Sequence, residues 1–368
     1  MTPLLPQGFR DTLPPHADAA SAVEARVLDV ARSHGYERAD PPLAEYADGL
    51  GARLKAGGLT DAVRFVDPVS QRSLAIRPDL TAQIARIAAT RMGHHPRPVR
   101  LCYAGSVIKL RASELNPARE WRQIGCELIG LDSVAAAREI VGVAVEGLGA
   151  AGAQGLSVDF TLPDLVDTLA AGALPVAAER IDALRDRLDA KDAGAVAEIA
   201  PEYLPLIEAA GPFATALERL RSFDTGDVLA SRIAGLEAIA ASLGNDVAMT
   251  LDPTERHGFE YQTWLGFSLF VAGAVREVGR GGTYTVMHED GSEERATGFS
   301  IFADAILAQA GTGERRRLFL PIGTDAAVGA AMRADGWVTV AGLDDEDTPQ
   351  AQLATHLWID GAAQALND

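Results

Sequence analysis

REWRQIGCELIG, residues 119–130, alternates as a β-strand does and places polar side chains on one of its two faces. One face would carry Arg122, Ile124, Cys126 and Leu128. The opposite face would carry Trp121, Gln123, Gly125, Glu127 and Ile129. An amide and a carboxylate therefore share a face, on either side of a glycine. Because burying such groups without partners is costly, this face is expected to hold a ligand or water.

The charge of the chain disfavours nucleic-acid partners. In 368 residues, 51 acidic side chains stand against 33 basic ones, which gives a formal net charge of −18. Such a surface repels phosphate backbones unless it has a strong local basic patch, and the longest basic run is only residues 315–317. The charge therefore argues against an RNA-binding role.

Cysteine usage and hydropathy indicate a cytoplasmic protein. Cys102 and Cys126 lie in apolar, strand-like surroundings without metal-ligand spacing, as buried reduced thiols do. The first residues, MTPLLPQGFRD, have no signal-peptide pattern, and no stretch approaches the roughly 18 apolar residues of a membrane helix. We expect no metal, no cofactor and no membrane association.

The first 162 residues alternate between helical and strand patterns. Apolar spacing predicts helices over residues 18–34, 79–92 and 133–148. Strands are predicted over residues 36–40, 63–66, 73–76, 99–109, 121–129 and 156–162. The polar loop 111–119 joins two of these strands, so we expect them to form an antiparallel hairpin.

Composition changes at Pro163, after which Ala, Leu, Glu, Asp and Arg predominate to about residue 243. This stretch predicts short helices inserted between strands, and strand signals return at residues 247–251, 258–271 and 298–301. From Arg317 onward, RLFLPI, DAAVGAAMRADG and WVTVAG form a β-α-β pattern. We therefore predict an α+β protein with an antiparallel sheet flanked by helices (1–162 and 247–312), a helical insertion (163–246) and a small C-terminal α/β piece (313–368).

Three patterns are interpreted as structural rather than functional. GLGAAG, residues 147–152, matches the dinucleotide-binding fingerprint in letters, but it follows a helix and precedes a strand, which is the reverse of what that site needs. We interpret it as the end of a helix. His94-His95 and the acidic run 344–347 are interpreted as exposed connections.

Two further segments leave their role open. In RPDLTAQIAR, residues 77–86, Asp79 either caps the helix that follows or projects with Thr81 toward a ligand amine. In RGGTYTV, residues 280–286, the glycines before Tyr284 suit either a turn or the close approach of a ligand to the backbone.

Taken in order, several segments resemble the catalytic core of histidyl-tRNA synthetase, a class II synthetase. GYERADPPLAEY (35–46) is similar to motif 1, YAGSVIKLRASELNPAREWRQIGCELIG (103–130) to motif 2, and GFSIFADAIL (298–307) to motif 3. RPDLTA, HGFEYQT (257–263) and GRGGTYTV (279–286) resemble histidine-specific segments. The resemblance covers most of residues 5–310 and implies a class II synthetase-like fold and dimer.

By motif position, the resemblance also implies a histidine-binding site. Its residues would be Asp79, Thr81, Gln123, Glu127, Tyr261 and Tyr284. Two carboxylates favour an ammonium group or a protonated imidazole, and aromatic rings can pack against the imidazole plane. Gly125 would leave room for this ligand over the sheet.

The chain departs from the synthetase pattern where ATP is held. Lys109 stands at the phosphate-binding arginine of motif 2, and Arg111 at its acidic neighbour. His257 replaces the catalytic arginine, and Ala305 the arginine of motif 3. Lysine, histidine and alanine do not reproduce the bidentate grip of arginine, and losing one such group can cost about 100-fold or more in rate. Lys109, Arg111 and His257 would be remnant nucleotide contacts.

This combination resembles the regulatory subunits of ATP phosphoribosyltransferase, which are synthetase paralogues in histidine biosynthesis. Only about 50 residues follow Arg317, against roughly 100 for an ordinary small domain, so an anticodon-binding domain would be curtailed. The resemblance implies a non-catalytic subunit that forms a hetero-octamer with a short catalytic subunit, activates it and takes part in histidine feedback control. A truncated histidyl-tRNA synthetase and another synthetase-like ligase are the alternatives, and both require ATP.

Overall fold

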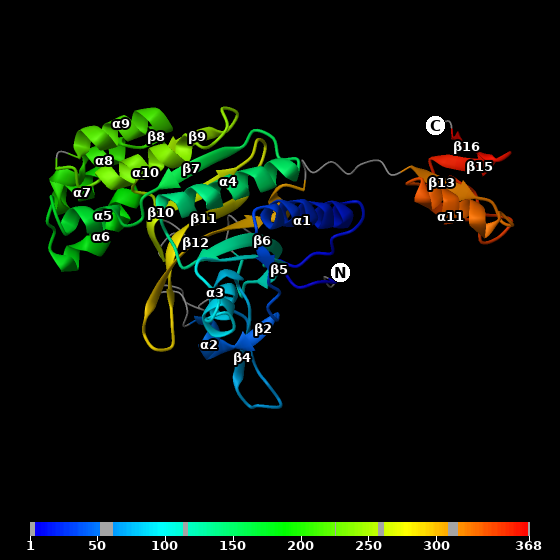
Figure 1. Ribbon diagram of the computed structural model, residues 1–368, viewed down its shortest axis with the longest axis horizontal. Helices are drawn as coiled ribbons and strands as arrows, with labels where there is room; N and C mark the ends of the chain where they lie inside the picture. Colours follow the sequence, from blue (N-terminus) through cyan, green and yellow to red (C-terminus); the bar gives the residue numbers. More distant parts are fainter. Residues whose placement is uncertain are drawn as a thin grey trace. The chain divides into compact units, whose positions relative to one another are not determined.

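The computed structural model describes residues 4–51, 62–112, 117–224, 226–256, 261–307 and 316–366. The chain divides into two compact units, residues 1–311 and 312–368. Both units are drawn in Figure 1.

A nine-stranded sheet, counted over the described residues, forms the centre of the first unit (Figure 1). In spatial order its strands are β1 (Glu37–Arg38), β5 (Val99–Ile108), β6 (Glu120–Ile129), β12 (Glu293–Phe302), β11 (Gly279–Met287), β10 (Gln262–Phe270), β7 (Ser157–Thr161), β9 (Ala248–Leu251) and β8 (Gly211–Pro212). Neighbouring strands are antiparallel except for the pairs β1–β5 and β7–β9. The predicted hairpin is confirmed as β5–β6, in which Cys102 pairs with Cys126.

Two helices cover one face of this sheet. They are α1 (His16–Ser33) and α4 (Val134–Ala150), which pack against each other. Ser133 accepts a hydrogen bond from the backbone N–H of Ala136 and so caps the start of α4. Ile124, Cys126 and Leu128 point into this layer, as the alternation of the strand predicts.

The other face carries a second apolar cluster and a small sheet. Helix α3 (Thr81–Thr90) contributes to the apolar cluster. Leu80 and Ile84, at the start of α3, pack with Tyr103, Trp121 and Tyr284 from the large sheet. The small sheet has the order β2 (Ala44–Tyr46), β4 (Ser73–Ile76) and β3 (Arg64–Val66), and α2 (Ala47–Gly51) follows β2. Strand β6 therefore lies between two packed layers, with its polar residues on the α3 side.

The region after β7 is helical, as predicted. Its helices are α5 (Leu165–Ala170), α6 (Ala178–Asp189), α7 (Ala193–Ile199), the 3-10 helix η1 (Pro201–Tyr203), α8 (Pro205–Glu208), α9 (Phe213–Phe223) and α10 (Ala230–Ala240). Buried leucines of these helices, such as Leu188 and Leu220, join the same core as β7 and β9. They extend the unit at the β7 end of the sheet (Figure 1).

The second unit contains the predicted β-α-β pattern and a hairpin that the sequence analysis missed. β13 (Arg317–Leu320), α11 (Ala326–Ala334) and β14 (Val338–Ala341) form the β-α-β part, with the two strands parallel. β15 (His356–Ile359) and β16 (Ala362–Ala365) complete the sheet in the order β14-β13-β15-β16. Asp360 and Gly361 both have positive φ in the tight turn between them, so the Asp-Gly pair was a usable hairpin signal.

The interpretation of GLGAAG as a helix end, and of His94-His95 and residues 344–347 as exposed connections, is also confirmed. Gly147 and Gly149 lie in the last turns of α4, and Gly152 follows with a φ of +93°, as a helix terminus requires. His94 and His95 are exposed, and residues 344–347 lie in a loop. No helix among the described residues is long and apolar enough to cross a membrane.

Candidate functional site

The register of the central strands aligns the polar residues of the α3 face in adjoining rows. In one row, Tyr103 of β5 pairs with Gly125 of β6, which pairs with Ser300 of β12. In the next row, Glu127 of β6 pairs with Gly298 of β12. Each row thus sets a large polar side chain beside a glycine on the neighbouring strand.

The glycines provide the space in which these side chains lie over the sheet. A Cβ on Gly125 would collide with the Tyr103 hydroxyl and with the Phe299 carbonyl oxygen. A Cβ on Gly298 would collide with the Glu127 carboxylate. The expectation that Gly125 leaves room for a ligand is therefore wrong, because the phenol of Tyr103 fills that space.

Gln123 is only 1% exposed, and protein groups satisfy its amide. Its Nε2 donates to Asp79 Oδ2 at 2.7 Å and to Ser300 Oγ at 2.6 Å. Its Oε1 accepts from the backbone N–H of Leu80 at 3.1 Å. The amide therefore ties the start of α3 to strands β6 and β12.

Glu127 is equally buried, and both of its oxygens accept tyrosine hydroxyls. Tyr103 donates to Oε1 at 3.0 Å, and Tyr284 donates to Oε2 at 2.7 Å. Burial raises the pKa of Glu127 to about 8, and the negative charge of Asp79 adds to the rise. The tyrosine hydrogen bonds oppose this rise only in part.

Asp79 lies just before α3 and fits the capping role, while its role toward a ligand amine stays a prediction. Its Oδ1 accepts from the backbone N–H of Thr81 at 2.7 Å, at the start of α3, while its Oδ2 accepts from Gln123. Thr81 Oγ1 lies 3.3 Å from the hydroxyl of Tyr103, which in turn lies 3.1 Å from Ser300 Oγ. We call these linked residues the Glu127 network: Asp79, Thr81, Tyr103, Gln123, Glu127, Tyr284 and Ser300.

Tyr261 lies beside this network rather than within its hydrogen bonds. Its ring packs edge-on against that of Tyr284, with centroids 6.1 Å apart and planes at 73°. Burial raises the pKa of Tyr261, and the charges of Asp79 and Glu127 raise it further. The structure therefore gathers all six predicted histidine-site residues on one face of the sheet.

The sequence analysis missed Tyr103 and Ser300, which link the two halves of the network. A usable signal existed for Tyr103, because an aromatic residue on the predicted hairpin stands across from Gly125. Ser300 is a hydroxyl residue in the apolar run GFSIF. Its position opposite Gly125 depends on the pairing of β12 with β6, two strands that lie far apart in the sequence.

The predicted nucleotide contacts lie away from these hydrogen bonds. Lys109 and Arg111 are exposed beyond the end of β5, and Lys109 Nζ lies 5.5 Å from the centroid of the Trp121 ring. Among the described residues, neither side chain hydrogen-bonds the Glu127 network. His257 lies outside the described residues.

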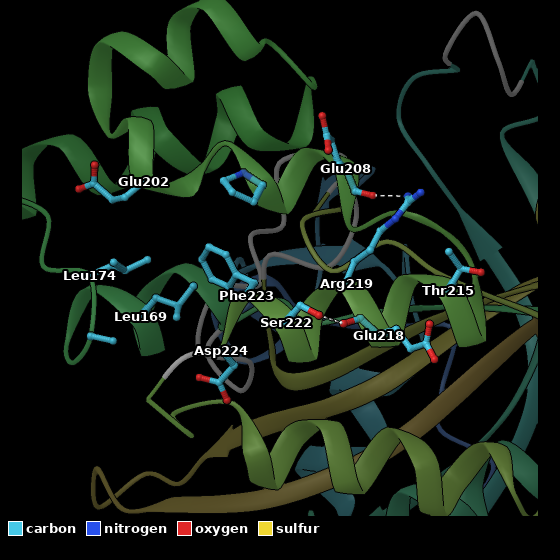
Figure 2. Close-up of a pocket in the computed structure, with 12 residues that line it drawn as sticks. Leu169, Leu174, Glu202, Glu208, Thr215, Glu218, Arg219, Ser222, Phe223 and Asp224 are labelled. Carbon is cyan, nitrogen blue, oxygen red and sulfur yellow. Dashed lines mark hydrogen bonds between the residues drawn. The ribbon is translucent and has the colours of Figure 1, made fainter.

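A separate groove of about 730 Å³ opens in the helical insertion (Figure 2). Leu169, Leu174 and Phe223 supply apolar side chains, and Glu202 and Glu208 are among its acidic ones. It lies among α5, η1, α8 and α9, not at the Glu127 network.

Comparisons with known proteins identify related chains. A family model described as histidyl-tRNA synthetase matches residues 8–306. The ATP phosphoribosyltransferase regulatory subunit of Rhodospirillum centenum is 40% identical over 377 residues, which cover 99% of this chain and 97% of that protein. The corresponding subunit of Paramagnetospirillum magneticum is 41% identical over 357 residues, covering 95% and 93%.

A solved structure supports the same fold. The crystal structure of an ATP phosphoribosyltransferase regulatory subunit/histidyl-tRNA synthetase from Bacillus halodurans superposes with a TM-score of 0.79 at 21% identity, covering 96% of both chains. The predicted class II synthetase-like α+β fold is thereby confirmed.

We expect Gly125→Ala to destabilise the protein. The added methyl group forces Tyr103 and the β12 backbone apart, which should lower the free energy of unfolding by about 1–3 kcal/mol. Gly142→Ala is the matched control, because a Cβ there meets nothing within 4 Å and a helical alanine should gain about 0.5–1 kcal/mol. Urea unfolding of both variants measures the difference, and equal stabilities would contradict the close contact at Gly125.

Glu127→Gln should change how stability depends on pH. The folded pKa of about 8 exceeds the ordinary 4.5, so the folded state binds more protons between these values. Wild-type stability should fall relative to the variant by up to about 1.4 kcal/mol per pH unit as the pH rises through this window, and the difference should level off above it. Unfolding at several pH values measures this difference, and parallel curves for the two proteins would refute the raised pKa.

Proposed function

This chain belongs to the histidyl-tRNA synthetase family, within the ATP phosphoribosyltransferase regulatory subunits, and from that membership we propose that it senses histidine without synthetase chemistry. It is a regulatory subunit in histidine biosynthesis, as its relatives of 36–41% identity over nearly the whole chain are. The proposals below concern its ligand, its lack of catalysis and its assembly.

The observation that supports histidine as the ligand is the Glu127 network. Asp79 and Glu127 provide two carboxyl groups, and Tyr261 and Tyr284 provide two aromatic rings, packed edge to face, beside them. A cationic group attracts carboxylates, and an imidazole ring packs on aromatic faces. An amino acid with an imidazole side chain meets both demands.

The protonation of Glu127 provides a coupling between ligand and protein. With a pKa of about 8, this buried carboxyl is mostly neutral at pH 7, which reduces the cost of burying it. A cation placed next to it favours the ionised form, so binding would release a proton from Glu127. Sensing then requires that the two assembly states differ in affinity for histidine, typically by about 1–3 kcal/mol.

Loss of the ATP-holding arginines supports a non-catalytic role. Lys109 and Arg111 stand in motif 2, Ala305 stands in the short helix η2 (Ala303–Ala305), and His257 replaces the third arginine. The residue before Ala305, Asp304, pairs with Arg10 at 3.1 Å and accepts from the backbone N–H of Arg122 at 3.3 Å. A carboxylate next to the position of the missing guanidinium fork disfavours a triphosphate.

The assembly we propose joins this chain to a short catalytic subunit in a hetero-octamer built on synthetase-like dimers. A complex from Thermotoga maritima, described as ATP phosphoribosyl transferase (HisG:HisZ), contains a chain of this fold, with a TM-score of 0.60 at 20% identity. Exposed apolar side chains around the small sheet, including Leu43 at 46% and Val66 at 63%, support self-association near motif 1. The assembly would be cytoplasmic and would not bind tRNA.

Calorimetry with histidine tests the ligand. The wild-type chain should bind histidine, and Gln123→Ala combined with Glu127→Ala should abolish binding, because the network loses both its amide and its carboxyl. Gln350→Ala combined with Glu179→Ala, both at exposed positions, is the matched control and should bind normally. Unchanged binding by the first double variant would place the sensor elsewhere.

Activity measurements test the regulatory role. Addition of this chain should activate a short-form ATP phosphoribosyltransferase catalytic subunit, and histidine should reduce the activity of the mixture. The chain alone should give no histidine-dependent exchange between ATP and pyrophosphate, since the phosphate grip is altered. Exchange at a rate typical of a synthetase would show that the chain is an enzyme after all.

A further inference from the structure

The groove in the helical insertion has no part in the proposed ligand site. We call it the insertion groove: its volume is about 730 Å³, and α5, η1, α8 and α9 border it (Figure 2). Its apolar part consists of Leu169, which is buried, and of Leu174 and Phe223, which are only half-buried. A partner that covered these side chains would remove apolar surface from water, and such burial favours association.

Helix α9 supplies the largest share of the groove lining. Thr215, Glu218, Arg219, Ser222 and Phe223 all line it, and they follow one side of the helix at positions i, i+3, i+4, i+7 and i+8. The first four of these side chains are exposed. The buried residues of α9 lie on another side and pack into the core. The helix therefore offers two turns of surface that its own core packing does not use.

Three carboxylates border the apolar part of the insertion groove. Glu202 lies on η1, Glu208 on α8 and Glu218 on α9, and within the described part of the chain none of them forms a salt bridge. Arg219, which also lines the groove, donates to the backbone carbonyl of Glu208 at 2.6 Å and not to a carboxylate. Elsewhere in the insertion, a carboxylate such as Asp164 pairs with an arginine. The groove thus has an excess of negative charge around an apolar floor.

The secondary structure of the walls favours a helix as the occupant. The walls are helices, whose backbone groups bond within the helix except at its ends, so an extended peptide finds no strand edge to pair with. A second helix can lie along two turns of α9 at an interaxial distance of about 8–10 Å. Apolar side chains on one stripe of that helix would enter the groove, and basic residues beside the stripe would meet the carboxylates.

We propose that the insertion groove binds a basic amphipathic helix of a partner protein. The helix places apolar side chains against Leu174 and Phe223, and it places lysine or arginine residues against Glu202 and Glu218. In the view of Figure 2, Phe223 lies between these two carboxylates, which belong to different walls. The same negative charge repels phosphate backbones and anionic lipid surfaces, which disfavours a nucleic acid or a membrane as the occupant.

Fluorescence anisotropy with labelled synthetic peptides tests the groove in the full chain. The first peptide is an amphipathic helix of about 18 residues, with leucine at i, i+3, i+4 and i+7 and lysine on both flanks. A second peptide has glutamate in place of lysine, and a third has the same residues in scrambled order. The wild type should bind the first peptide at least about tenfold more tightly than the other two, because these lack either the charge or the apolar stripe.

A blocking variant locates the bound peptide. Ser222→Trp fills the groove from an exposed position of α9 and should weaken binding of the lysine peptide at least about tenfold. Ala197→Trp, at an exposed position of α7 (Ala193–Ile199) outside the lining, is the matched control and should bind as the wild type does. Thermal unfolding verifies that both variants are folded.

A charge variant tests the carboxylates without adding bulk. Glu202→Gln combined with Glu218→Gln should weaken binding of the lysine peptide by about two- to tenfold, because two exposed ion pairs are lost. Glu179→Gln combined with Glu198→Gln changes the net charge equally at exposed positions of α6 and α7, and it should bind as the wild type does. This control separates the groove from the general attraction of an acidic protein for a basic peptide.

Three results would overturn the proposal. The first is a wild type that does not bind the lysine peptide, and the second is an equal loss of affinity in the groove variants and their controls. Titration with spermine and sedimentation of the wild type cover other occupants. Binding of spermine, or self-association, that Ser222→Trp abolishes while the peptide does not bind would assign the groove to a polyamine or to a second copy of this chain.

Discussion

The Glu127 carboxyl lies on a β-sheet with almost no access to water, and it can do so only because Gly298 on the next strand has no side chain. Both of its oxygens must then be satisfied within the protein, and Tyr103 and Tyr284 supply the hydroxyls. Tyr103 reaches Glu127 over Gly125. The hydrogen bond from Tyr103 to Glu127 therefore needs a second glycine, Gly125, on strand β6. The site thus depends on one buried carboxyl and on the two glycines that make space for it and its partner.

The same contacts hold the α3 side of the protein together. Gln123 binds the N-terminal end of α3 through Leu80 and Asp79, and it binds β12 through Ser300. A ligand at the proposed site would therefore meet groups that bind both a helix start and the central strands. Motion of α3 would also reach the small sheet, because Arg86 and Gln83 of α3 both contact Glu45 of β2. For a regulatory subunit this is a physical route from a ligand site to the surface region near motif 1, where we propose self-association.

The proposed retention of a binding site without catalysis is consistent with where the residues lie. The side chains proposed to recognise the amino acid point from packed strands and from the start of a helix, and these positions also stabilise the fold. Two of the proposed ATP positions, Lys109 and Arg111, are exposed beyond the end of β5, where substitution disturbs little packing. Loss of phosphate-binding groups at such positions costs the fold little, whereas loss of Gln123 or Glu127 leaves buried partners unsatisfied.

The sequence by itself determined most helices of the fold, the β5–β6 hairpin and the face on which the Glu127 network lies. Period-two alternation is a local property, so it separated Gln123 and Glu127 from Ile124, Cys126 and Leu128 without knowledge of any partner strand. It also indicated the β5–β6 hairpin, since a short connection leaves few other pairings. Ordered motifs then indicated Asp79, Thr81 and Tyr284, and the structure places all three beside Gln123 and Glu127. Only the tertiary structure decided that Tyr103 fills the space above Gly125 and that Ser300 joins Gln123. The second of these facts depends on the register between strands that lie far apart in the chain, and this register is not encoded in the local period of the sequence.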